Sequence, residues 1–234
     1  MYAMKILVYC PYSNLHELAD LTMPNKVEYC DTHGYGFDTH ELGGEGINIE
    51  GQYTFRRLGF VVDKLKNGEW DEWDWVWVCG LDVLITNMKI KLESIVDDNF
   101  GLIHSCDALE PCLACMDSFL VSRKSIPLLE CVMSYRDNPI GGLLEQSTTF
   151  SLVKEERFKG IRKLLPQRVM NSYQYKSENF TPYNHCGPNW PDAMDSLGHS
   201  GEWQPGDFVI HVGATNSVEF KLGFIREFLK NVQR

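Results

Sequence analysis

Short apolar runs alternate along this chain with segments of helical periodicity, and this alternation is what most constrains its fold. Residues 5–9 (KILVY) form an apolar run that ends at Cys10 and Pro11, and residues 75–79 (WVWVC) form another that ends at Gly80. Runs of this length and composition are typical of buried strands, and the first is expected to be parallel. Residues 56–65 have the apolar spacing of an amphipathic helix. The pattern predicts an α/β fold.

Further elements continue the alternation. Strands are predicted at residues 101–104, 118–121 and 208–212, and helices at residues 126–135, 143–153 and 220–232. A second short run at residues 26–30 leads into residues 31–36, a polar segment with two glycines that predicts a loop. Residues 179–206 are expected to be irregular. Because the 234 residues are 44% hydrophobic, one domain spanning residues 1–234 is expected.

Charge and apolar patterning exclude several classes of protein. The net charge of −10 argues against a nucleic-acid partner, which would require a basic surface. The best apolar stretch, residues 75–85, contains Asp82 and is shorter than the about 20 residues of a membrane span. The first residues do not have the pattern of a signal peptide. The eight cysteines are therefore expected to be reduced thiols.

Polar residues follow three of the predicted strands. They are the corner that begins at Cys10, Asp82 after the second run, and His211 in the late strand. Open α/β sheets bind ligands at the carboxyl ends of their strands. A carboxylate and an imidazole there suit a divalent cation that also holds phosphate oxygens. The alternative for a lone Asp after a strand is a turn or helix-cap residue.

Six sequence blocks occur in an order that points to one enzyme family. The first, N-[KR]-x-x-Y-[AC]-x-x-H-G-Y, is matched by Asn25, Lys26, Tyr29, Cys30, His33, Gly34 and Tyr35. The second, W-x-W-x-x-D-x-D-x-x-I-x-N, is matched by Trp75, Trp77, Asp82, Ile85 and Asn87, with Gly80 in place of the first Asp. The others lie at residues 119–123, 145–146, 166–173 and 203–211, as F-x-x-[RS]-[RK], E-Q, P-Q-R-x-x-N-S-Y and W-x-x-G-D-F-x-x-H. With these blocks, the chain resembles glycosyltransferase family 34 over residues 2–215.

The resemblance implies a single GT-A domain, with a mixed central sheet flanked by helices. It implies retaining transfer of a sugar from a nucleoside diphosphate donor, expected to be UDP-linked, to a glycan hydroxyl. It places Mn²⁺ or another divalent cation at Asp82 and His211. The residues expected to contact the donor are Tyr9, Cys10, Pro11, Tyr12, His33, Arg57, Gly80, Leu81 and Asp82. For Arg56 and Arg57, which stand where the family has a lysine, the alternative is a solvated helix face.

The resemblance also implies the catalytic residues. Gln146 would lie beside the anomeric carbon and stabilise positive charge on the sugar, while Glu145 and Asp117 would orient hydroxyl groups. A covalent route needs a carboxylate nucleophile, which Gln146 cannot supply. Without the resemblance, Glu145 would be interpreted as a helix-surface charge.

Gly80 is the main departure from the family pattern. Because the first carboxylate of D-x-D is missing, metal binding is expected to be weaker, and the alternative function is a non-catalytic nucleotide- or glycan-binding relative. Family members are commonly anchored in the Golgi by an N-terminal helix. None is recognised here, so we expect a soluble, cytoplasmic protein or an excised domain from the Golgi lumen.

Two other patterns suggest sites. His104, Cys106, Cys112 and Cys115 have a spacing that superficially suits zinc in an interaction module, although buried reduced cysteines explain them better. Trp75 and Trp77 alternate with apolar residues and are expected in the core. Trp190 and Trp203, in the irregular segment, are the candidates for acceptor contact.

Overall fold

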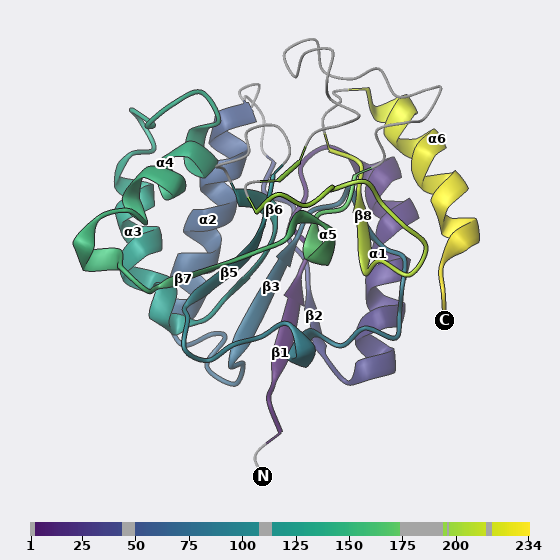
Figure 1. The fold of residues 1–234 in the computed structure, drawn as a ribbon, viewed down its shortest axis with the longest axis horizontal. Coiled ribbons are helices and arrows are strands. Elements are labelled where there is room, and N and C mark those ends of the chain that lie inside the picture. The colour runs from purple at the N-terminus through teal and green to yellow at the C-terminus, as the bar shows by residue number, and fades with distance from the viewer. Residues whose placement is uncertain (1–2, 44–49, 108–113, 174–193, 196, 214–216) are drawn as a thin grey trace.

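A mixed β-sheet forms the middle layer of the protein in this computed structural model, which describes residues 3–43, 50–107, 114–173, 194–195, 197–213 and 217–234 (Figure 1). Its strand order is β2-β1-β3-β6-β5-β7. The strands are β1 (Ile6–Tyr9), β2 (Gly36–Asp38), β3 (Trp75–Cys79), β5 (Leu102–Cys106), β6 (Ala114–Val121) and β7 (Arg162–Leu165). β6 is antiparallel to β3 and β5, while the other pairs are parallel. The predicted mixed sheet is therefore confirmed.

Helices cover both faces of this sheet (Figure 1). On one side lie α2 (Glu50–Lys66), α3 (Ile126–Ser134) and α4 (Leu144–Leu152). On the other lie α1 (His16–His33), α6 (Val218–Phe228) and a small antiparallel sheet of β4 (Val83–Ile85) and β8 (Val209–His211). The shorter helices are α5 (Gln167–Met170) and the 3₁₀ turns η1 (Leu92–Ser94), η2 (Arg123–Ser125), η3 (Glu156–Phe158) and η5 (Leu229–Asn231).

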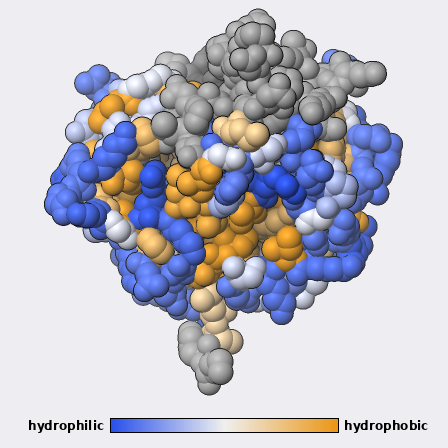
Figure 2. Space-filling model, in the orientation of Figure 1, coloured by the Kyte–Doolittle hydropathy of each residue, from blue (hydrophilic) through white to orange (hydrophobic). Residues whose placement is uncertain are grey.

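Burial on both faces explains why the central strands have continuous apolar sequences. In β3, Val76 and Val78 pack with α2 and α3, whereas Trp75 and Trp77 pack with α1 and the small sheet. Strands that are covered on both faces have nearly continuous apolar sequences, because the side chains on both faces are removed from water. Figure 2, in the orientation of Figure 1, shows hydrophilic residues around the edge of the visible side of the molecule and hydrophobic residues toward its middle. Trp75 and Trp77 are core residues, as expected.

One predicted segment has a different structure. The run at residues 26–30 is the C-terminal part of α1, which continues past Pro24 and ends at Gly34, where φ is +72°. Sequence patterning missed this helix because its buried face contains polar residues. Asn25 exchanges hydrogen bonds with the backbone of Ile85, and Lys26 Nζ donates to the carbonyl of Val83 at 2.7 Å. These bonds fix the segment that follows β3.

The other predicted strands and helices are present, with shifts of a few residues at their ends. Much of residues 179–206 lies outside the described part of the chain. No described helix is long and apolar enough to span a membrane.

Candidate functional site

Asp82 and His211 are brought together by the small sheet at the carboxyl end of β3. Val83 pairs with His211, and the amide of Val212 donates to the carbonyl of Asp82 at 2.8 Å. As a result, His211 Nε2 lies 3.5 Å from Asp82 Oδ1. The two residues expected at neighbouring strand ends therefore do meet.

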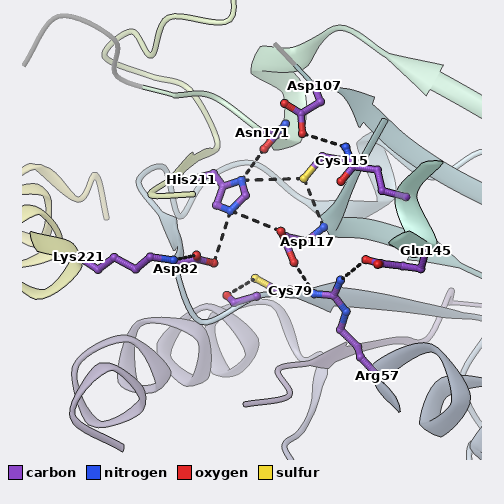
Figure 3. A network of polar contacts seen from close by, with 12 residues as sticks. Arg57, Cys79, Asp82, Asp107, Cys115, Asp117, Glu145, Asn171, His211 and Lys221 are labelled. Carbon is purple, nitrogen blue, oxygen red and sulfur yellow. Dashed lines mark hydrogen bonds and ion pairs between the residues drawn. The ribbon is translucent and has the colours of Figure 1, made fainter. Parts of the chain in front are cut away.

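The ring of His211 is oriented from its other nitrogen (Figure 3). Its Nδ1 lies 2.7 Å from Asn171 Oδ1, and Asn171 Nδ2 donates to the carbonyl of Cys106 at 2.9 Å. Since the Asn171 oxygen accepts, Nδ1 carries a proton and Nε2 points at Asp82 and at Asp117, whose Oδ2 is 3.9 Å away. Burial lowers the pKa of His211, but the two carboxylates outweigh it and raise the pKa overall.

Arg57 connects Asp117 to Glu145. Its buried guanidinium forms an ion pair with Asp117 and lies 3.3 Å from Glu145 Oε1. Burial would lower the pKa of Arg57, yet the two carboxylates raise it. For Glu145, burial raises the pKa although Arg57 opposes the shift. Arg57 therefore positions Asp117 and Glu145, and its side chain is 1% exposed. Its contact with a donor phosphate stays a prediction from the sequence.

Lys221, on α6, lies on the opposite side of Asp82 from this ion-pair network (Figure 3). Its Nζ is 2.5 Å from Asp82 Oδ2, and the two side chains are 15% and 17% exposed. Burial raises the pKa of Asp82, but Lys221 and His211 bring the pKa well below its ordinary value. Asp82 is therefore a carboxylate held between two nitrogen groups.

Gln146, the predicted catalytic amide, is at the start of α4 beside Glu145. Its Nε2 donates to Asp107 Oδ2 at 3.1 Å. Asp107, which follows β5, is 3% exposed. The bond orients the amide of Gln146, and the sequence blocks did not indicate Asp107 for this position.

The first strand contributes backbone more than side chains to this edge. Tyr9 is buried and its ring stacks on Phe60, with centroids 5.2 Å apart. Burial raises the pKa of Cys10, which is also fully buried. The carbonyl of Pro11 accepts from the Tyr53 hydroxyl at 3.0 Å. The side chains of Tyr9 and Cys10 are thus part of the core, and their contact with a donor stays a prediction.

The remaining predicted donor residues have different positions. Tyr12 is partly exposed just after β1, while Leu81 is buried in the loop that carries Asp82. His33 Nε2 lies 2.7 Å from the Met88 carbonyl, near the start of β2 and thus at the amino ends of the parallel strands. The structure therefore does not bring His33 to the edge where Asp82 lies.

The acceptor and zinc candidates have different surroundings, and Cys115 Sγ lies 3.9 Å from His211 Nδ1. Trp203 donates to Thr86 Oγ1 at 3.2 Å and packs edge-on against Phe228 of α6. Trp190 and Cys112 fall outside the described residues. His104 is buried, and burial lowers its pKa far below the ordinary value. Cys106 and Cys115 are buried cysteines in the reduced state, as packing of reduced cysteines predicts.

Sequence reasoning missed Lys221, Asn171 and Asp107. Asn171 was part of a recognised block, without an assigned role. Lys221 belongs to a helix predicted only from its apolar period, and a single lysine on such a helix gives no signal. Only the packing of α6 against α1 brings its amine to Asp82.

The site of the manganese ion that the family resemblance implies has an incomplete set of ligands. The buried Nε2 of His211 has no hydrogen-bond partner, as a ligand atom would. However, Gly80 replaces one carboxylate and Lys221 is bonded to the other. Among the described residues, no group of three His, Cys, Asp or Glu side chains is arranged to hold a metal. These residues do not fit the ion.

Comparison with known proteins gives the fold a class. A glycosyltransferase involved in the glycosylation of the major capsid of PBCV-1 is 17% identical, with a TM-score of 0.71 over 95% of this chain and 99% of that chain. The galactosyltransferase LgtC, solved with donor and acceptor sugar analogs, is 14% identical, with a TM-score of 0.53 over 98% and 96% of the two chains. The bifunctional glycosyltransferase WbbM is 10% identical, with a TM-score of 0.61 over 99% of this chain and 52% of that chain. No curated protein sequence matches significantly.

The fold and the family match together define the protein as a glycosyltransferase with the GT-A fold. The sequence profile that matches is that of the galactosyl transferase GMA12/MNN10 family, over residues 5–104. This match confirms the resemblance to glycosyltransferase family 34 in that part of the chain, which includes Gly80 and Asp82.

Proposed function

We propose that this glycosyltransferase moves a sugar from a UDP-linked donor to a glycan hydroxyl with retention of anomeric configuration. The observation that carries the proposal is the ion-pair network at the carboxyl edge of the sheet, where Asp82, His211 and Asp117 meet. Ligands of α/β sheets bind at this edge. LgtC, which shares the fold, was solved with donor and acceptor sugar analogs.

The roles follow from where each group lies. The donor diphosphate binds at the Asp82 end of the network and the sugar extends toward Asp117. Gln146, whose amide is oriented by Asp107, stabilises positive charge on the sugar as the bond to the diphosphate breaks. Asp117, whose side chain is 42% exposed, orients a hydroxyl group of the sugar, and the buried guanidinium of Arg57 positions Asp117 through an ion pair.

The buried ion pair of Glu145 favours attack on the same face over a covalent intermediate. A covalent route needs a carboxylate free to approach the anomeric carbon. The Glu145 side chain is 4% exposed and lies 3.3 Å from the Arg57 guanidinium, so its attack would break a buried ion pair. Asp117, which is 42% exposed and paired with Arg57, is assigned to a hydroxyl group of the sugar, and the acceptor hydroxyl attacks from the side that the diphosphate leaves.

The choice of UDP and the acceptor contacts rest on the family resemblance. Trp203 remains the acceptor candidate within the described residues, and its ring is partly covered by Phe228. The divalent cation that the sequence predicts at Asp82 and His211 has no support from the described residues around them, and a metal titration tests it.

A nucleotide-release assay tests the function. Wild-type protein is incubated with UDP-galactose, UDP-glucose, UDP-xylose and GDP-mannose, with and without Mn²⁺ and a mixture of oligosaccharide acceptors. We expect UDP release from one donor, a rate lower by about 10²–10³ in Asp82→Asn, and no change in Glu156→Gln, whose side chain is 86% exposed. NMR of the product should show the anomeric configuration of the donor.

The outcome that contradicts the proposal is nucleotide binding without release from any donor. Gly80 gives this alternative its support, since a degenerate D-x-D motif is what a non-catalytic nucleotide- or glycan-binding relative would have. Inversion in the product would instead refute the retaining mechanism alone.

A further inference from the structure

Lys221 bonds the one carboxylate that remains of the D-x-D motif (Figure 3). Its Nζ lies 2.5 Å from Asp82 Oδ2, and both side chains are mostly buried. α6 packs on α1, and α1 holds the start of β4 through Lys26, whose Nζ donates to the carbonyl of Val83 at 2.7 Å. Packing therefore fixes the ammonium group beside Asp82. A divalent cation at this oxygen would have to displace the ammonium group or lie against it.

The other carboxylate near His211 is also paired with a cation. Asp117 Oδ2 lies 3.9 Å from His211 Nε2, while Asp117 Oδ1 forms an ion pair with the buried guanidinium of Arg57. A divalent cation between Asp82 and Asp117 would approach both an ammonium and a guanidinium group. In a partly buried site such repulsion is weakly screened. The negative charge that would attract the ion is thus already compensated by cations of the chain itself.

The space beside Asp82 is also closed to a further carboxylate. A Cβ at Gly80 would lie 3.0 Å from Asp82 Oδ1 and 3.3 Å from the carbonyl oxygen of Asp117, closer than ordinary contacts. A longer side chain there would require Asp82 to move, although Asp82 is bonded to Lys221. The two features act in the same direction, because Gly80 removes one ligand and Lys221 occupies the ligand that remains.

We propose that this site excludes the divalent cation and that the donor binds as the metal-free nucleotide. The identity of the donor rests on the proposed function, whereas the exclusion of the metal follows from the charges of the site. Lys221 is then a specificity-determining residue, since it keeps Asp82 from acting as a metal ligand. Among the described residues, the buried Nε2 of His211 has no hydrogen-bond partner. One nitrogen atom does not hold Mn²⁺, which prefers about six ligands, mostly oxygen.

Titration with MnCl₂ tests the exclusion on the full chain without substrate. Free Mn²⁺ is measured by electron paramagnetic resonance with wild type, Lys221→Met, Lys221→Arg and the control Lys230→Gln, whose side chain is 69% exposed. Since methionine lacks the charge, Lys221→Met should bind one Mn²⁺ at least about 10-fold more tightly than wild type. Lys221→Arg keeps the charge and should bind Mn²⁺ as weakly as wild type and Lys230→Gln do. Adding His211→Ala to Lys221→Met should abolish the gain, which would show that the new ion lies at this site.

Two results of this titration would overturn the inference. One is a Mn²⁺ ion that wild type binds and that His211→Ala loses. The other is a folded Lys221→Met variant that gains no Mn²⁺, because Lys221 would then not be what excludes the metal. Circular dichroism checks folding, and Lys221→Gln, which is uncharged but can still donate to Asp82, replaces Lys221→Met if that variant does not fold.

Calorimetry with UDP tests the consequence for the donor. Wild type should bind UDP in EDTA, and replacing EDTA with MnCl₂ should improve the affinity by less than about 3-fold. A larger improvement would overturn the inference. If wild type binds no UDP under either condition, the proposed donor is wrong, while the MnCl₂ titration still decides whether the site excludes the metal.

Discussion

Replacing Arg57 with methionine should lower the free energy of unfolding by about 3–5 kcal/mol at pH 7, because it leaves a buried carboxylate without its cation. The guanidinium, 1% exposed, contacts Asp117 and Glu145. Methionine fills the space of the arginine stem without the charge. The Asp117 side chain is 42% exposed and water can screen it, so most of the cost arises at Glu145, which is 4% exposed.

The assay is a double-mutant cycle by urea unfolding. Because Arg57→Met with Glu145→Gln replaces the pair by uncharged groups, it should regain at least about 2 kcal/mol of the loss caused by Arg57→Met alone. Arg136→Met is the matched control, since Arg136 is 58% exposed, and it should change stability by less than about 1 kcal/mol.

The pH dependence gives a second test of the same reasoning. Burial already raises the pKa of Glu145 with Arg57 present, and removing Arg57 should raise it further. In the variant, folded Glu145 then binds a proton that the unfolded chain has released, so stability falls as the pH rises above the unfolded pKa of about 4.3. The deficit of Arg57→Met relative to wild type should shrink between pH 8 and pH 5. A deficit that is constant with pH, or a double variant as unstable as the single one, would refute this account.

Three further predictions concern the frame and the chemistry. Gly101→Ala should lower the free energy of unfolding by at least about 1 kcal/mol in thermal unfolding, because the new Cβ would lie 2.7 Å from a backbone nitrogen. Gly223→Ala, whose Cβ would have nothing within 4 Å, should be neutral or stabilising, and equal effects of the two substitutions would contradict this. Asp207→Ala should lower the free energy of unfolding in urea by about 1.5–3 kcal/mol, since it loses two hydrogen bonds of 2.7 and 3.0 Å from Arg168. Glu227→Ala, at a side chain that is 67% exposed, should lower it by under about 1 kcal/mol, and similar losses in the two variants would count against this reasoning. Gln146→Ala should bind UDP as wild type does yet transfer sugar about 10²–10³ more slowly, and parallel losses of affinity and rate would show a structural role instead.

The strands were predictable because their burial on both faces leaves a direct mark on the sequence. Residues 75–79 are apolar without interruption, and β3 has these bounds in the structure. The helix that contains residues 26–30 was not predictable in the same way. Its buried face uses the polar groups of Asn25 and Lys26 to bond the loop after β3, so its apolar period is weak.

The candidate site was predictable only where a residue follows a strand. Asp82 and His211 were selected because they follow or end apolar strands, and the β4–β8 register brings them together. Arg57 was selected for contact with the donor, and in the structure its guanidinium is buried against Asp117 and Glu145. A helix pattern does not tell which charged residue will be buried against a carboxylate. Lys221 depended on the packing of two helices, which no local pattern encodes.

Opposite charges alternate along the whole site, and this arrangement determines how it should respond to change. In order, the groups are Lys221, Asp82, His211, Asp117, Arg57 and Glu145. Lys221 and His211 are carried by α6 and β8 on one side of the sheet, Asp117 by β6 within it, and Arg57 and Glu145 by α2 and α4 on the other, while Asp82 lies between β3 and β4. Each carboxylate except Glu145 lies between two nitrogen groups, so removing any member changes the charge that its neighbours experience, and the effects of substitutions should not add. His211 joins the two halves of this chain of charges, since its Nε2 lies 3.5 Å from Asp82 Oδ1 and 3.9 Å from Asp117 Oδ2. A substitution of His211 should therefore change the surroundings of both carboxylates at once.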